Sequence, residues 1–307
     1  MKKIIVFLFV LVLAMFVYIT YTSLDSDGFL SKKISCYTGK DGACYELGEL
    51  YLDKDKNESI KYFEKACELE NPLACNHIGY AYQTGLLGAV DNQKAKKYYQ
   101  SACDKGFILA CNNLGFINET VDNNLTNALK YYEISCDKNN SFACNKAGII
   151  YQGNQDFMKS VESFIKSCNS GDTVGCNNLA AYYQNGIGID KNETMAAHLY
   201  EAACNAGNFT SCNNLGYFFQ EGIVVEKNLN AAVQLYDIAC KNNETFACTN
   251  LGYLVQDGVG VEQNLEVALN LYNKACQLGN QTGCQMRDAL ISAIKQTQNS
   301  ENNTTKE

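Results

Sequence analysis

The same arrangement of small, apolar and polar positions repeats along this chain about every 36 residues. The first half of each period carries a cysteine. The residues one before it, three after it and seven after it are small or apolar, as with Ser211, Leu215 and Phe219. Because this spacing places side chains on one face of a helix, each repeat is predicted to begin with an amphipathic helix.

The second half of each period predicts another helix, built on an alternation of small and large residues. An alanine is followed four positions later by an aromatic residue, and a small residue comes three positions after that, as with Ala232, Tyr236 and Ala239. These side chains again share one helical face. Small and large residues on one face allow two helices to interdigitate, so we expect the two helices of each repeat to pack together.

Glycines recur inside the first predicted helix, directly after its core residue, as with Gly216. The equivalent glycines are Gly79, Gly115, Gly148 and Gly252. A glycine inside a helix costs about 1 kcal/mol relative to alanine. Its recurrence predicts that a neighbouring helix packs too closely for a Cβ. The helix is predicted to end at a glycine in the left-handed conformation, at Gly85, Gly186, Gly222 or Gly258.

The sixteen cysteines form eight pairs, each with seven intervening residues: Cys36/Cys44, Cys67/Cys75, Cys103/Cys111, Cys136/Cys144, Cys168/Cys176, Cys204/Cys212, Cys240/Cys248 and Cys276/Cys284. Metal clusters and redox centres favour the closer C-x-x-C spacing. Two antiparallel helices joined by a turn can instead bring such a pair within disulfide reach. We therefore predict eight local disulfides, each stabilising the fold by about 2–3 kcal/mol.

The repeat predicts an all-α fold, a right-handed α/α solenoid of about seven helix pairs over residues 36–290. This organisation replaces the two globular domains that the length of 307 residues would otherwise suggest. Residues 23–35 are interpreted as a linker. Residues 291–307 form a polar C-terminal tail, and we expect its Gln-, Asn-, Ser- and Thr-rich part after about Ile294 to be disordered.

In residues 1–22, two lysines follow Met1 and precede an apolar run from Ile4 to Ile19. This arrangement predicts either a cleaved signal peptide or a retained N-terminal membrane anchor. In both cases the body of the protein would be secreted or periplasmic. Paired cysteines fit this localisation, because disulfides persist in oxidising compartments.

Charge and histidine content narrow the possible functions. The net charge of −8 argues against a nucleic-acid partner, since phosphate binding requires a basic surface. The two histidines, His77 and His198, belong to different repeats and are interpreted as polar surface or groove residues. The sequence therefore predicts no metal site, and it indicates no cofactor.

A serine hydrolase of the β-lactamase type would require Ser-x-x-Lys together with S-D-N and K-T-G elements. Ser-x-x-Lys occurs at Ser135, Ser163 and Ser292, but neither of the other elements is present. Three isolated matches in a chain of this length are background. The residues alone thus leave the catalytic site unknown.

Three further positions of the first helix predict a ligand-binding groove. The residues one, five and eight after the second cysteine share a stripe away from the core face. The candidate groove residues are Asn76, Asn112, Asn145, Asn177, Asn213, Tyr80, Tyr217, Tyr253, Gln83, Gln184, Gln220 and Gln256. Amides both donate and accept hydrogen bonds, so they can pair with an extended peptide. The alternative is that Asn marks helix starts and Gln is a neutral surface residue.

The Leu-Gly-x-x-Tyr and Ala-x-x-x-Tyr-x-x-Ala motifs resemble the Sel-1-like repeat, a relative of the tetratricopeptide repeat, over about residues 36–290. The cysteine pairs are similar to those of the Helicobacter cysteine-rich protein family. That resemblance implies an exported protein that binds penicillin-like β-lactams and hydrolyses them weakly. The alternative is a non-catalytic scaffold whose concave groove binds a peptide or protein, including cell-wall peptides.

One motif is independent of the repeat function. Acidic-x-Asn-x-Ser/Thr occurs at Asn57, Asn124, Asn139, Asn192 and Asn303. It is similar to the extended acceptor of N-linked glycosylation in some bacteria, and chance in an Asn-rich chain is the alternative explanation.

Overall fold

A computed structural model of the protein describes residues 28–86 and 88–304, with side chains as far as residue 297. The predicted signal or anchor at residues 1–22 lies outside these residues. The described residues form sixteen α-helices and no strand: α2 (Phe29–Tyr37), α3 (Asp41–Tyr51), α4 (Lys56–Glu68), α5 (Pro72–Thr84), α6 (Asn92–Asp104), α7 (Ile108–Thr120), α8 (Leu125–Cys136), α9 (Ser141–Gly153), α10 (Phe157–Asn169), α11 (Thr173–Asn185), α12 (Glu193–Asn205), α13 (Phe209–Glu221), α14 (Leu229–Lys241), α15 (Thr245–Asp257), α16 (Leu265–Gln277) and α17 (Gln281–Thr304).

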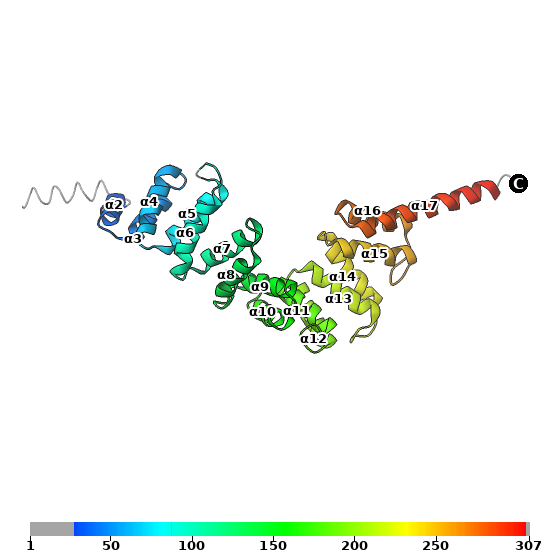
Figure 1. The fold of residues 1–307 in the computed structure, drawn as a ribbon. Coiled ribbons are helices and arrows are strands. Elements are labelled where there is room, and N and C mark those ends of the chain that lie inside the picture. Colours follow the sequence, from blue (N-terminus) through cyan, green and yellow to red (C-terminus); the bar gives the residue numbers. More distant parts are fainter. Residues whose placement is uncertain (1–27, 87, 305–307) are drawn as a thin grey trace, which may run out of the picture. The chain divides into compact units, whose positions relative to one another are not determined.

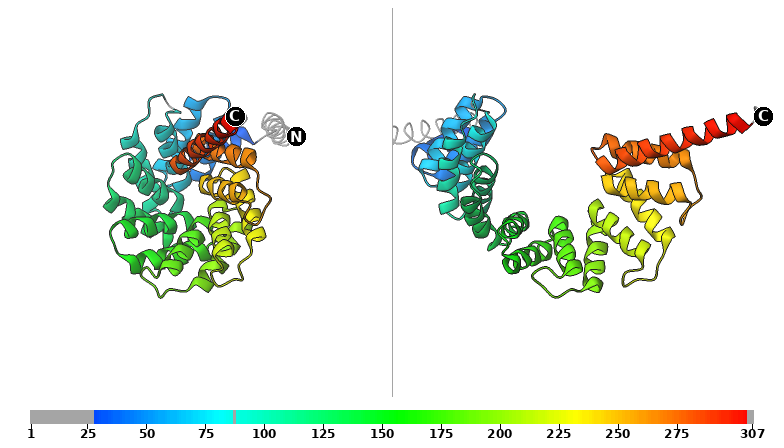
Figure 2. Two further views of the ribbon diagram at one scale, coloured as in Figure 1. Left: turned by 90° about the vertical axis from the view of Figure 1, so that its right-hand side faces the viewer. Right: turned by 45° about the vertical axis from the view of Figure 1, so that its right-hand side comes forward.

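Consecutive helices pack as pairs, from α3 with α4 to α15 with α16, and each pair packs on the next within its unit (Figure 1). The chain divides into two compact units, residues 1–138 and 139–307, which we describe separately. Figure 2 shows the helix pairs of each unit from two further directions. The predicted all-α solenoid of about seven helix pairs is confirmed.

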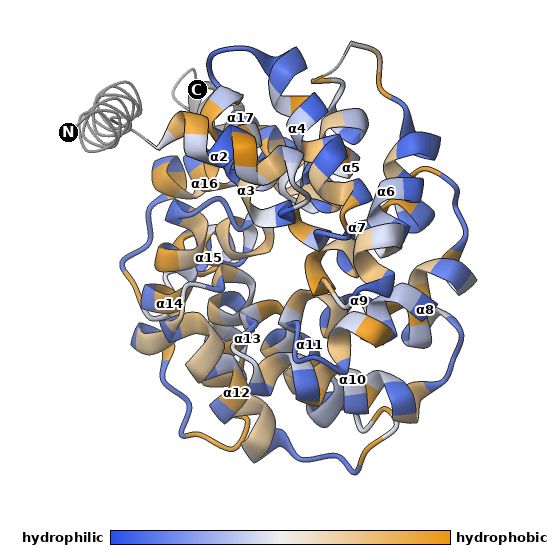
Figure 3. Cartoon of the chain, turned by 90° about the vertical axis from the view of Figure 1, so that its left-hand side faces the viewer, coloured by the Kyte–Doolittle hydropathy of each residue, from blue (hydrophilic) through white to orange (hydrophobic). Residues whose placement is uncertain are grey.

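In six of the seven helix pairs the core contains a contact between a glycine of the first helix and an aromatic ring of the second, and the α11–α12 pair has Ala180 in place of the glycine. A Cβ at Gly216 of α13 would lie 2.8 Å from Cε1 of Tyr236 of α14. Gly252 and Tyr272 repeat this contact in the next pair, and both rings are fully buried. The predicted close helix approach is therefore confirmed. The helices are amphipathic, with hydrophobic and hydrophilic residues on each (Figure 3).

Disulfides connect the second helix of one pair to the first helix of the next. Seven of the eight predicted bonds have Cα–Cα distances between 4.4 and 4.8 Å, and they join Cys36–Cys44, Cys67–Cys75, Cys103–Cys111, Cys168–Cys176, Cys204–Cys212, Cys240–Cys248 and Cys276–Cys284. Cys136 and Cys144 are disulfide-bonded as well. Among the described residues no cysteine is free, which fits an oxidising, extracellular or periplasmic environment.

Helix ends follow the predicted chemistry. Gly85, Gly186, Gly222 and Gly258 all adopt left-handed φ angles after a first helix. The C-terminal expectation was wrong, because α17 continues through the polar tail to Thr304. The start of α17 packs on α16 and α15, so the tail extends an anchored helix. No helix within residues 28–86 and 88–304 is both long and apolar enough to cross a membrane.

Candidate functional site

Each first helix presents one partly exposed stripe, which we call the first-helix face. It contains the residues two before and one, five and eight after the second cysteine, on α5, α7, α9, α11, α13 and α15. At the fifth position Tyr80, Tyr217 and Tyr253 are 53, 44 and 47% exposed. These aromatic side chains lie outside the core, as predicted, and are open to a partner.

The position two before the cysteine adds large apolar residues that the sequence analysis missed. The exposed residues there are Leu73, Leu109, Phe142, Val174 and Phe246. They precede the fifth position by seven residues, which is two helical turns and therefore the same stripe. The heptad spacing was the signal that could have identified them. The stripe thus combines apolar side chains with the predicted amides.

In four repeats the asparagine one after the second cysteine accepts a hydrogen bond from the next repeat. Asn250 of α15 donates from Nδ2 to Oδ1 of Asn213 of α13 at 2.9 Å. The same bond joins Asn214 to Asn177 at 3.1 Å, Asn178 to Asn145 at 2.8 Å and Asn113 to Asn76 at 3.1 Å. These bonds form an asparagine ladder between neighbouring first helices. Asn145 is buried, whereas Asn76, Asn112, Asn177 and Asn213 are half-buried.

The glutamine eight after the cysteine is held by the core tyrosine of its own pair. The Tyr236 hydroxyl donates to Oε1 of Gln220 at 3.0 Å. Equivalent bonds are Tyr99 to Gln83 at 2.6 Å, Tyr200 to Gln184 at 2.9 Å and Tyr272 to Gln256 at 3.1 Å. Burial raises the pKa of these tyrosines, to about 12 for Tyr272, so the hydroxyls stay protonated donors.

These internal bonds decide what the face offers to a ligand. The oxygens of the four asparagines and four glutamines in these bonds already accept a hydrogen bond within the fold, so a ligand meets reduced acceptor capacity beside the N–H donors. At Gln220 one such donor reaches Oε1 of the neighbouring Glu221 at 3.0 Å. We expected amides free both to donate and to accept, whereas the structure uses part of their acceptor capacity within the fold.

The repeat formed by α5 and α6 departs from the asparagine ladder. His77 occupies the position of the donating asparagine, and its ring packs against the rings of Tyr45 and Phe63 at 5.5 and 5.0 Å. Burial lowers the pKa of His77, although the charge of Glu49 opposes this effect. A cavity of about 450 Å³ opens here, with Asn76 and Tyr80 in its lining. The first-helix face therefore adjoins an apolar pocket in this repeat.

The serines considered for hydrolysis and the histidines considered for metal binding lie on separate helices. The buried Ser135 donates its hydroxyl to the Ile108 carbonyl, and Ser292 donates to the Asp288 carbonyl. Ser163 is 8% exposed. His198 is exposed on α12, far along the chain from His77. Across the described part of the chain, no group of three or more His, Cys, Asp or Glu residues could hold a metal ion.

Six stretches of the chain match the Sel1 repeat, at residues 39–71, 72–107, 108–140, 173–208, 210–244 and 245–280. Helicobacter pylori cysteine rich protein B is 31% identical over 43% of this chain and 94% of its own length, with a TM-score of 0.36. No curated protein matches the sequence.

Two solved structures share the fold at lower identity. The c5321 protein of uropathogenic Escherichia coli, a protective antigen displaying an SLR fold, has a TM-score of 0.77 and 24% identity, with 86% of this chain and 59% of that chain covered. A Sel1 repeat protein from Oxalobacter formigenes has a TM-score of 0.71 and 20% identity, with coverages of 86 and 80%. The chain thus spans 59% of the length of c5321.

Proposed function

Because the chain belongs to the Sel1 repeat family, in the cysteine-rich group that includes Helicobacter pylori cysteine rich protein B, we propose that it is an exported scaffold that binds an extended peptide segment of a protein partner. The segment lies along the first-helix face of the unit formed by residues 139–307. Repeat scaffolds of this kind use extended surfaces formed by successive repeats for protein recognition.

The observation that carries this proposal is the exposure of aromatic rings on adjacent helices. Tyr217 and Tyr253 are nearly half exposed on α13 and α15, whose positions are linked by the Asn250–Asn213 bond. Tyrosine is enriched at protein interfaces, where it buries a large area at low entropic cost. The two rings therefore provide neighbouring anchor points for a bound segment.

The polar part of the face determines the chemistry of the partner. Amide N–H donors match the carbonyl oxygens of an extended peptide backbone. Glu221 and Asp257 follow directly after Gln220 and Gln256 and are exposed, so the partner segment would carry Lys or Arg beside its apolar residues. We expect its affinity to fall as salt increases.

The placement of the candidate serines favours binding over β-lactam hydrolysis. Ser135 and Ser292 both donate their hydroxyl protons to backbone carbonyls of the fold. An activated serine would instead have to transfer its proton to a nearby base. We expect purified, oxidised protein to show no benzylpenicillin turnover above the buffer rate.

The test uses peptides selected by display against the oxidised full chain and calorimetry of the tightest one. Tyr217→Ala with Tyr253→Ala should weaken binding at least tenfold, which corresponds to about 1.4 kcal/mol. The matched control is Ile238→Ala with Val267→Ala, two residues that are 46 and 43% exposed on the second helices α14 and α16. Equal affinity of both double variants would contradict the proposal.

A further inference from the structure

We propose that Asn124, Asn139 and Asn192 are N-glycosylation sites, each receiving one oligosaccharide on Nδ2 after export. All three lie in turns, before α8, α9 and α12. This assignment is independent of the peptide-binding face and rests on a motif that the proposed function does not use.

Acidic residues precede potential acceptors more often than composition explains. The sequence contains ten Asn-x-Ser/Thr motifs, at Asn57, Asn118, Asn124, Asn139, Asn192, Asn208, Asn243, Asn280, Asn302 and Asn303. With 33 acidic residues among 307, about one of the ten would have an acidic residue two positions earlier. Five do, at Asn57, Asn124, Asn139, Asn192 and Asn303.

Among the acceptors whose side chains are described, exposure distinguishes those with an acidic residue two positions earlier from most of those without one. The four described acceptors with an acidic residue, at Asn57, Asn124, Asn139 and Asn192, are all exposed. Of the others, Asn118 and Asn280 are buried, at 3 and 7% exposure, and Asn208 is half-buried. Among the acceptors whose side chains are described, only Asn243 lacks the acidic residue and is exposed.

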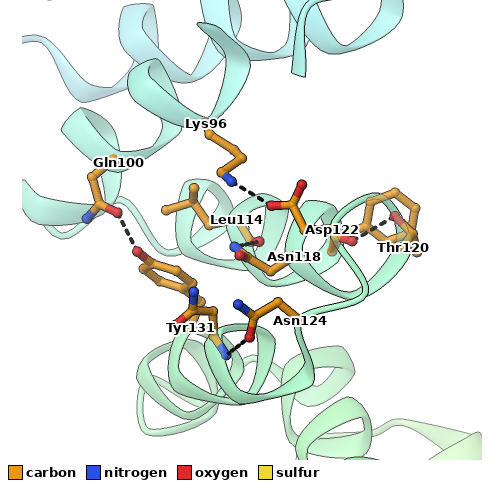
Figure 4. Close-up of polar contacts among 10 residues, drawn as sticks. Lys96, Gln100, Leu114, Asn118, Thr120, Asp122, Asn124 and Tyr131 are labelled. Carbon is orange, nitrogen blue, oxygen red and sulfur yellow. Dashed lines mark hydrogen bonds and ion pairs between the residues drawn. The ribbon is translucent and has the colours of Figure 1, made fainter. Parts of the chain in front are cut away.

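Figure 4 shows the contrast within six residues of the chain. Asn118 is buried and donates from Nδ2 to the Leu114 carbonyl at 2.7 Å, so its nucleophilic nitrogen is already hydrogen-bonded inside the fold. Asn124 lies in the turn before α8, and its Oδ1 accepts from Asn127 N at 3.0 Å. Asp122, the acidic residue of this motif, pairs with Lys96.

The accessibility of the Ser or Thr in each motif further reduces the number of candidate glycosylation sites. Thr126 and Thr194, which complete the motifs of Asn124 and Asn192, are exposed. Ser59, which completes the motif of Asn57, is fully buried and donates to the Gly48 carbonyl at 2.6 Å. Because that hydroxyl is not accessible in the folded protein, Asn57 is excluded from the assignment.

The reaction is compatible with the helix caps. Asn124 and Asn192 cap α8 and α12 through Oδ1, which accepts the N–H groups of Asn127 and Met195. Glycosylation joins Nδ2 to the anomeric carbon of an oligosaccharide carried on a polyprenyl diphosphate. The carbon–oxygen bond to the diphosphate breaks, the lipid diphosphate leaves, and the amide loses one proton. Oδ1, which accepts the capping hydrogen bond, takes no part in the reaction.

The first experiment is glycopeptide mass spectrometry of the full chain isolated from the cells that produce it. We expect an oligosaccharide at Asn124, Asn139 and Asn192, and unmodified Asn57, Asn118 and Asn280. Unmodified asparagine at all three proposed positions would overturn the assignment. Modification of Asn57 to the same extent as Asn192 would overturn the part that rests on the accessibility of the hydroxyl residue.

The chain offers a matched pair for the second experiment. Asn139 and Asn243 occupy the same place after a cysteine, are both exposed, and have φ angles of 61° and 66°. Asn139 follows Asp137, whereas Asn243 follows Lys241. Expressed in the same cells, Asp137→Asn should remove the glycan at Asn139, and Lys241→Asp should add one at Asn243. No change in either variant would contradict the role of the acidic residue.

A third variant tests the hydroxyl requirement. Asn228 caps α14, is exposed and follows Glu226 by two residues, but Asn230 stands where the motif needs Ser or Thr. Asn230→Thr should add one glycan at Asn228, and Asn230→Ala should add none. Circular dichroism of both variants confirms that the helix is retained. A glycan in neither variant would count against the proposal.

Discussion

The hydroxyl of Tyr236 donates a hydrogen bond to Oε1 of Gln220, although sixteen residues separate them in the chain. The ring of Tyr236 is fully buried against Gly216, while Gln220 lies at the edge of the first-helix face. One side chain of the second helix therefore fills the core and also fixes a residue of the candidate binding surface. Stability and recognition are linked through this contact.

Removing the Tyr236 hydroxyl should measure its contribution to the free energy of unfolding. Tyr236→Phe keeps the ring and leaves Oε1 of Gln220 without its donor, so we expect the free energy of unfolding to fall by about 0.5–1.5 kcal/mol. Denaturant unfolding of the oxidised protein provides the value. Tyr217→Phe, which removes an exposed hydroxyl at 44% side-chain exposure, should leave stability unchanged. Equal effects of the two substitutions would refute this role for Tyr236.

The glycine contact predicts an unusual response to alanine. Gly216→Ala should destabilise the protein by about 1–3 kcal/mol, because the new Cβ meets the Tyr236 ring. Helix propensity alone would favour alanine by about 1 kcal/mol. Thermal unfolding distinguishes the two signs. The control is Ala180→Gly, at the equivalent position of α11 where the chain already has alanine, and it should not stabilise the protein.

The asparagine ladder should appear as energetic coupling between repeats. Asn213→Ala and Asn250→Ala each remove one partner of a single hydrogen bond. A double-mutant cycle should therefore give a coupling free energy of about 0.5–1.5 kcal/mol. Additive effects, with coupling near zero, would show that the two amides stabilise their own helices independently, as the alternative interpretation of Asn as a helix-start residue would have it.

The burial of His77 predicts a pH effect on stability. Its pKa is lowered in the folded chain, so as pH falls through about 6.5 the unfolded chain takes up the proton first. Stability should therefore decline below that pH and be restored above it. His77→Asn, which introduces the residue found at the equivalent Asn113, should lose less stability between pH 7 and pH 5. Urea midpoints at both pH values provide the comparison, and parallel losses would contradict it.

Much of the fold could be predicted because its rules are local. The cysteine pairs, the capping glycines and the alanine–tyrosine spacing each lie within one or two helical turns, and the structure confirms them. The exposure of Tyr80, Tyr217 and Tyr253 also followed from helical spacing. The disorder expected after about Ile294 was wrong, since composition does not reveal that α17 is anchored on α16.

The hydrogen bonding of the candidate site could not be predicted, because its partners are distant in the chain. Asn250 and Asn213 are 37 residues apart, and their bond depends on how two repeats are rotated against each other. The sequence analysis identified Asn213 as a polar residue of the stripe, but it did not single out Asn250. It did not indicate that the oxygen of Asn213 accepts a hydrogen bond from the next repeat.

The central claim is that the partner segment lies on the first helices, and site-specific photo-cross-linking tests it most directly. A benzophenone side chain is placed at position 217 of α13 or at position 238 of α14, where Tyr217 and Ile238 are similarly exposed at 44 and 46%. With the display-selected peptide bound, our account predicts cross-linking from position 217 and background yield from position 238. Equal yields, or a higher yield from position 238, would contradict it.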